Sequence, residues 1–77
     1  MKILIVEDEP EMQGLIKQFL EDENYTIETA GDFETGLDKI VSYDYDCILL
    51  DIMLPGGNGL ELLDELKKLN KADSVII

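Results

Sequence analysis

Short apolar runs alternate with stretches of helical periodicity along this chain of 77 residues, and this alternation limits the possible folds more than any other feature. The runs at 2–6 (KILIV) and 47–50 (CILL) are continuous, which is typical of strands buried on both faces. Strands are predicted over residues 2–6, 25–30, 47–50 and 75–77. Apolar residues at helical spacing predict helices over residues 10–21, 33–42 and 59–69. In the first of these, one apolar stripe is expected to face a core, made by Met12, Leu15, Ile16, Phe19 and Leu20. The predicted order is therefore β-α-β-α-β-α-β.

Strands that alternate with helices predict an α/β fold. Such a pattern gives a doubly wound parallel sheet with right-handed crossovers and helices on both faces. The length allows one small domain at most. The last predicted strand is short and apolar, and an uncovered strand of this kind would leave backbone groups unpaired.

The charge balance excludes several classes of function. The chain has 18 Asp and Glu against 6 Lys and no Arg, which gives a net charge of −12. This balance disfavours nucleic acid and anionic membranes as partners and favours a site that collects cations. A single cysteine, Cys47, and the lack of histidine exclude an internal disulfide, a Cys-based zinc site and a Ser–His pair. With no apolar run near membrane length, a cytoplasmic location is expected.

Acidic side chains directly follow two of the predicted strands. Glu7 and Asp8 end the first strand, and Asp51 ends the third. Ligands of doubly wound sheets bind at the carboxyl ends of the strands, so neighbouring strands would bring these three carboxylates to one rim. Crowded carboxylates take up a proton or recruit a cation, and Mg²⁺ binds in proteins through one or two carboxylates. Beside such an ion, Asp51 is a candidate nucleophile toward phosphorus.

The segment 3–9 (ILIVEDE) and the block 47–56 (CILLDIMLPG) with Gly59 closely resemble bacterial response-regulator receiver domains. The resemblance implies a flavodoxin-like sheet of strand order 2-1-3-4, truncated after strand four, so that residues 1–77 form a partial receiver domain. It implies that Asp51 accepts a phosphoryl group from a histidine kinase and that the chain is not a turnover enzyme. It also implies an Mg²⁺ site made by Glu7, Asp8, Asp51 and the backbone carbonyl of Met53.

The sequence departs from the family pattern in its number of repeats. The family has five βα units, and this chain carries three and the start of a fourth. A Ser or Thr expected after strand four and a Lys expected after strand five would lie beyond Ile77. The lysines that are present are expected away from the acidic rim, so phosphoryl transfer to Asp51 is expected to be weak.

Two alternatives remain open from the sequence. The chain could be a half-domain scaffold that has lost the switch and forms a homodimer through the edge of strand four. A haloacid-dehalogenase-like phosphatase also uses an aspartate with Mg²⁺, but that family has a second aspartate at the position of Met53. The glycines of the following loop, Gly56, Gly57 and Gly59, lack the spacing of a phosphate-binding loop and indicate a turn.

Overall fold

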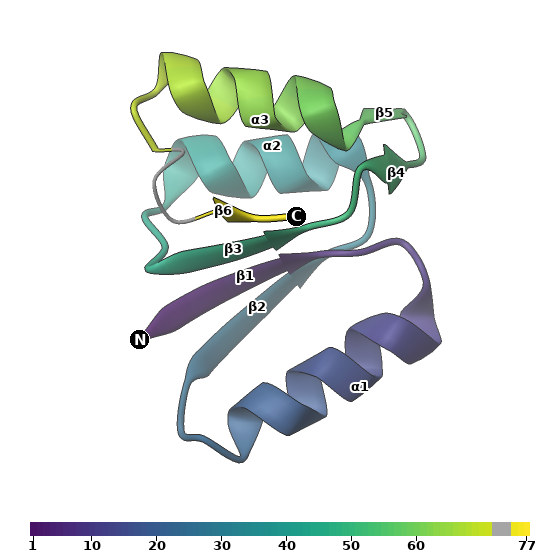
Figure 1. Ribbon diagram of the computed structural model, residues 1–77, viewed down its shortest axis with the longest axis vertical. Coiled ribbons are helices and arrows are strands. Elements are labelled where there is room, and N and C mark those ends of the chain that lie inside the picture. The colour runs from purple at the N-terminus through teal and green to yellow at the C-terminus, as the bar shows by residue number, and fades with distance from the viewer. Residues whose placement is uncertain (72–74) are drawn as a thin grey trace.

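The computed structural model describes residues 1–71 and 75–77. Its elements, in chain order, are β1 (Lys2–Val6), α1 (Pro10–Glu21), β2 (Thr26–Ala30), α2 (Phe33–Ser42), β3 (Cys47–Leu50), β4 (Met53–Leu54), β5 (Gly57–Asn58), α3 (Gly59–Lys68) and β6 (Val75–Ile76). Figure 1 shows α2 and α3 on one side of the main sheet and α1 on the other. In the described part of the chain, no helix is both long and apolar enough to cross a membrane.

The main sheet has the strand order β2-β1-β3-β6, and all its pairs are parallel. This confirms the predicted α/β fold with a doubly wound sheet of order 2-1-3-4, in which β6 takes the fourth place. Val6 pairs with Ala30 on one side and with Leu50 on the other. The three strands therefore end level with one another, and the residues that follow them meet at one rim.

Residues that favour the first turn of a helix mark where the three helices begin. Pro10 occupies the start of α1, where its fixed φ angle and missing N–H do no harm. The Asp32 carboxylate accepts a hydrogen bond of 2.7 Å from the N–H of Thr35 and so caps α2. The Asn58 side chain caps α3 in the same way, accepting from the N–H of Leu60 at 2.7 Å.

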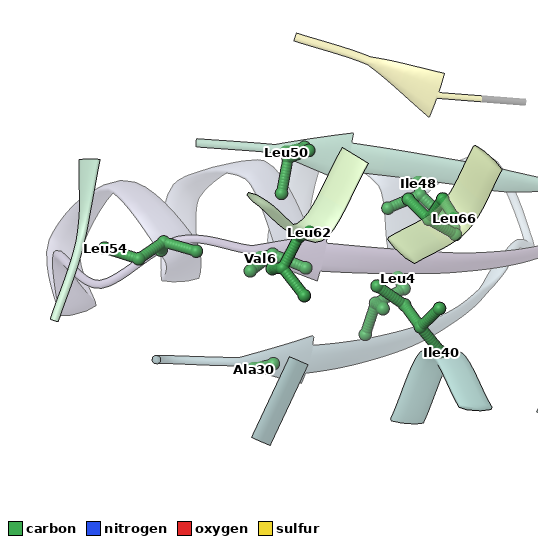
Figure 2. Close-up of a cluster of buried hydrophobic side chains, with 9 residues drawn as sticks. All are labelled: Leu4, Val6, Ala30, Ile40, Ile48, Leu50, Leu54, Leu62 and Leu66. Carbon is green, nitrogen blue, oxygen red and sulfur yellow. The ribbon is translucent and has the colours of Figure 1, made fainter. Parts of the chain in front are cut away.

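The core lies between the sheet and the pair α2 and α3. Alternate residues of β1 and β3 point to this side, and leucines of α3 and an isoleucine of α2 close over them (Figure 2). The buried cluster consists of Leu4, Val6, Ala30, Ile40, Ile48, Leu50, Leu54, Leu62 and Leu66. These apolar contacts hold the acidic ends of β1 and β3 side by side.

The opposite face of the sheet is covered less completely. Ile3 and Ile5 are buried there, at 3% and 1% exposure. The predicted apolar stripe of α1, however, is only partly covered: Leu15 is 63% exposed and Phe19 is 75% exposed. The prediction that the whole stripe faces a core was therefore wrong, because α1 is the only helix on this face in the described part of the chain.

A small hairpin occupies the segment that the sequence predicted to be a loop. β4 and β5 pair antiparallel, with Leu54 opposite Gly57. The two residues between them are Pro55 and Gly56, and Gly56 has a φ of +80°. Proline followed by a glycine at positive φ is typical of a tight turn of type II. The hairpin links the end of β3 to the start of α3.

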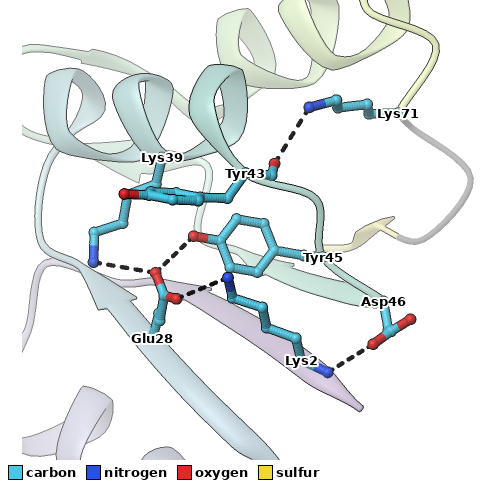
Figure 3. A network of polar contacts seen from close by, with 7 residues as sticks. All are labelled: Lys2, Glu28, Lys39, Tyr43, Tyr45, Asp46 and Lys71. Atoms are coloured by element: carbon cyan, nitrogen blue, oxygen red, sulfur yellow. Dashed lines mark hydrogen bonds and ion pairs between the residues drawn. The ribbon is translucent and has the colours of Figure 1, made fainter.

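A polar network lies at the opposite end of the sheet, where the strands begin (Figure 3). The Tyr45 hydroxyl donates a hydrogen bond of 2.8 Å to Glu28, and Lys2 and Lys39 form ion pairs with the same carboxylate at 3.1 and 3.7 Å. The Lys2 ammonium also lies 4.8 Å from the ring centroid of Tyr43. The sequence did not predict this network, which joins β1, β2, α2 and the segment before β3.

Lys71 makes further polar contacts at this end of the molecule, with the end of α2. It follows α3 in the chain, and its ammonium donates to the carbonyl oxygens of Ile40 and Tyr43 at 2.9 and 3.2 Å. Free carbonyls at the end of a helix are stabilised by a positive charge. Lys71 therefore ties the end of α3 to the end of α2.

Glu28→Gln should reveal the network in the pH dependence of stability. The hydrogen bond from Tyr45, followed by the contact with Lys2, lowers the pKa of Glu28 below its ordinary value of 4.5. A lowered pKa adds stability that is present above the unfolded-state value and is lost as the pH falls through the folded-state value. We expect the wild type to melt above the variant at neutral pH, with the difference shrinking below pH 4.5.

Thermal melts from neutral to acidic pH, followed by circular dichroism, measure this difference. The matched control is Glu61→Gln, because Glu61 is an exposed residue of α3 outside the network. A difference between wild type and Glu28→Gln that stays constant across this range would contradict the assigned role of Glu28.

Candidate metal centre

The site lies at the carboxyl ends of β1 and β3. The N–H of Glu7 donates to the carbonyl oxygen of Ala30 at 3.0 Å, and the N–H of Asp51 donates to that of Val6 at 2.9 Å. These two bonds continue the sheet pattern one residue beyond the strands. The backbone under each carboxylate is therefore held by a neighbouring strand.

Three carboxylates meet at this rim. One oxygen from each of Glu7, Asp8 and Asp51 lies within 4.8 Å of the other two. Asp8 is exposed, whereas Glu7 and Asp51 are half-buried. The three acidic residues singled out in the sequence are thus brought together, from two segments far apart along the chain.

Met53 lies two residues beyond Asp51, at the start of β4. Its N–H donates a hydrogen bond of 3.0 Å to Oδ1 of Asp51. Met53 is 79% exposed, and its backbone contacts the acidic rim through this hydrogen bond. The hydrogen bond fixes the rotamer of Asp51 and engages one of its two carboxylate oxygens.

The electrostatics of the cluster favour the uptake of positive charge. Burial raises the pKa of the Glu7 carboxyl above its ordinary value of 4.5, and the charges of Asp51 and Asp8 raise it further. The hydrogen bond from the Glu9 N–H acts in the opposite direction. A cation bound beside Glu7 would offset the repulsion that contributes to this raised pKa.

An apolar hollow of about 420 Å³ adjoins the cluster. It is lined by Ile5, Val6, Glu7, Ile16, Leu49, Leu50, Asp51, Ile52, Ile76 and Ile77. Apolar walls on one side reduce the solvation of Glu7 and Asp51 and strengthen their interaction with any bound charge.

The donor set fits a hard divalent ion such as Mg²⁺, which prefers oxygen ligands. In the described part of the chain, the lysine ion pairs involve acidic residues other than the three at this rim. Lys2 and Lys39, which were expected at the opposite rim, both pair with Glu28 there. The negative charge of the cluster is therefore not neutralised by these lysines.

Gln13 supports the site and was not identified from the sequence. Its side-chain amide donates to the carbonyl oxygen of Glu7 at 2.9 Å and to that of Ala30 at 3.4 Å. It lies in the first turn of α1, three residues after Pro10. A polar residue facing the sheet from an otherwise apolar stripe was the available signal.

The chain is similar in sequence to known response regulators. Response regulator ArlR of Staphylococcus aureus is 42% identical over 76 residues, which is 99% of this chain and 35% of ArlR. The chain thus spans about a third of the length of the curated relatives it matches.

Two solved structures involve the response regulator TrrA of Thermotoga maritima. TrrA in complex with Mg²⁺ and BeF is 44% identical with a TM-score of 0.85, and the match covers 91% of this chain and 61% of TrrA. The complex of the histidine kinase ThkA with TrrA matches at 43% identity and a TM-score of 0.84, covering 96% of this chain and 64% of that one.

The family of the response regulator receiver domain matches residues 3–77, a range that includes the whole acidic rim and the hairpin. This match favours a receiver domain over the alternative of a haloacid-dehalogenase-like phosphatase. The strand order and the sequence identity agree with it. The chain therefore belongs to the response regulator receiver domain family.

Proposed function

We propose that the chain is the phosphoacceptor of a two-component signalling system and that it receives a phosphoryl group on Asp51 from a histidine kinase. The observation that carries the proposal is the approach of carboxylate oxygens of Glu7, Asp8 and Asp51 to within 4.8 Å of one another. Such a cluster beside a candidate nucleophile suits Mg²⁺-dependent transfer of a phosphoryl group. In this role the chain is a phosphoacceptor and not a turnover enzyme.

The ion would be held by the carboxylates of Glu7, Asp8 and Asp51 and by the backbone carbonyl of Met53. A bound Mg²⁺ supplies positive charge that stabilises the phosphoryl oxygens. The N–H of Met53 holds Oδ1 of Asp51, which leaves the other oxygen to approach phosphorus. The side-chain amide of Gln13 stabilises the backbone of Glu7 by a hydrogen bond to its carbonyl oxygen.

In the transfer itself, an oxygen of Asp51 forms a bond to phosphorus as the bond between phosphorus and the kinase histidine nitrogen breaks. The electron pair of the broken bond returns to that nitrogen, and because the second ring nitrogen carries a proton, the imidazole leaves uncharged. The product is an acyl phosphate on Asp51 and a neutral histidine. The proposal is supported by the relatives, since TrrA has been solved both with Mg²⁺ and BeF and with the histidine kinase ThkA.

We expect transfer to the 77-residue chain to be slow. In the described residues, the lysine ion pairs lie elsewhere, so positive charge at the phosphoryl group would depend on Mg²⁺. A cytoplasmic location is expected from the family and stays a prediction. Formation of a homodimer through the edge of β6 stays a prediction: Ile76 is 57% exposed, and the oligomeric state in solution decides it.

Mass spectrometry after incubation with a small-molecule phosphodonor tests the proposal. We expect the wild-type chain to gain one phosphoryl group in the presence of Mg²⁺ and none when the metal is chelated. Asp51→Asn should abolish the gain because its amide is not a nucleophile toward phosphorus. Asp38→Asn is the matched control, since Asp38 is an exposed residue of α2, and it should be modified like the wild type. Modification that persists in Asp51→Asn would refute Asp51 as the acceptor.

A further inference from the structure

We propose that Gly59 is a positioning residue for this site, because the absence of a side chain lets the first turn of α3 rest on the Asp51–Ile52 peptide and so sets the position of the Asp51 carboxylate. The inference rests on the proposed function. It assigns to the start of α3 a role that goes beyond linking the hairpin to the helix.

The contact between Gly59 and the end of β3 is unusually close. A Cβ atom added to Gly59 would lie 2.5 Å from Cα of Ile52 and closer still to the carbonyl oxygen of Asp51. Gly59 is buried, and its N–H donates a hydrogen bond of 2.9 Å to the carbonyl oxygen of Ile52. Both obstacles are backbone atoms, which cannot rotate away as a side chain would.

The contacted peptide carries the atoms on which the site depends. It begins at the Cα of Asp51 and leads directly to Met53, whose N–H holds Oδ1 of Asp51. A side chain at position 59 would have to displace this peptide by about 1 Å to restore ordinary contact, and displacements of that size weaken metal and catalytic sites strongly. The carboxylate would then move relative to Glu7 and Asp8.

A second buried glycine provides a matched control. Gly36 lies on α2, and a Cβ there would meet only side chains: Val6 Cγ1 at 3.3 Å and Leu62 Cδ1 at 3.4 Å. Gly36→Ala therefore disturbs the core without pressing on the backbone of Asp51. The two variants add the same methyl group to the same residue type and differ in what that group touches.

Isothermal titration of each protein with MgCl₂ separates the two effects. We expect Gly59→Ala to bind Mg²⁺ about tenfold more weakly than the wild type, and Gly36→Ala to remain within about twofold even if its melting temperature falls. Circular dichroism gives the folded fraction by which each titration is corrected. Wild-type affinity in Gly59→Ala, or an equal loss in Gly36→Ala, would overturn the inference. A wild-type chain that binds no Mg²⁺ would instead refute the proposed function.

If Gly59→Ala does not fold, amide hydrogen exchange of the wild-type chain still decides the question. Mg²⁺ that binds Asp51 and the Met53 carbonyl should steady the peptide that Gly59 holds, so the Gly59 amide should exchange severalfold more slowly with Mg²⁺. The Gly36 amide, bonded to the carbonyl of Asp32 at 3.0 Å, should change little. An unchanged rate at Gly59 alongside demonstrated Mg²⁺ binding would overturn the inference.

Discussion

Leu62→Ala is expected to lower the free energy of unfolding by about 2–5 kcal/mol. Leu62 lies on α3, is fully buried, and belongs to the cluster that joins the helices to the sheet. Removing three carbons there loses their burial and leaves a cavity that a well-packed core closes only in part. A domain of this size has a total stability of about 4–12 kcal/mol, so the variant should be close to unfolding.

Thermal or urea unfolding followed by circular dichroism measures this loss, which corresponds to a fall in melting temperature of roughly 10 °C or more. Leu60→Ala is the matched control, because Leu60 lies on the same helix but is 54% exposed. It should change the free energy of unfolding by no more than about 0.5 kcal/mol. Equal losses for the two leucines would mean that α3 does not pack on the sheet as described.

Asp51→Asn is expected to stabilise the metal-free chain while it weakens Mg²⁺ binding. The substitution removes one of three like charges that lie within 4.8 Å of one another. Oδ1 of asparagine still accepts the hydrogen bond from the N–H of Met53, so the local backbone keeps its anchor. Because the rim is partly solvated and screened, the gain should be about 1 kcal/mol, or roughly 4–8 °C in melting temperature.

Melting curves with and without MgCl₂ test both parts of this expectation. The wild type should gain stability as Mg²⁺ is added, since a ligand that binds only the folded state stabilises it, whereas Asp51→Asn should gain much less. Asp8→Asn should behave similarly, and Asp38→Asn should follow the wild type in its response to the metal. A sharp fall in the metal-free melting temperature of Asp51→Asn would show that this carboxylate supports the fold.

The features that follow from local pattern were predictable from the sequence. Continuous apolar runs mark β1 and β3 because both faces of these strands are buried, and helical spacing marks the three helices. The approach of Asp8 and Asp51 follows from topology, since parallel neighbouring strands end at the same rim. The strand order itself came from the family resemblance, because periodicity alone does not say which strands are neighbours.

The features that depend on long-range packing were missed. The exposure of Phe19 reflects how little of the described chain covers α1, and helical spacing carries no information on that cover. The contact of Tyr45 with Glu28 joins the segment before β3 to β2, far apart along the chain. The β4–β5 hairpin was missed because two-residue strands are too short for a period to show. The signal that was present, Pro55 followed by Gly56, indicated only a turn.

The central position of β1 has a consequence for the order of events during translation. Ile3 pairs with Ile27 on one side and with Cys47 on the other, so both partners of this strand are made after it. While the nascent chain lengthens, β1 lacks its β3 neighbour until residues 47–50 have left the ribosome. The segment between Val6 and Cys47 carries many carboxylates. Their mutual repulsion between chains should keep β1 from aggregating before β3 is available.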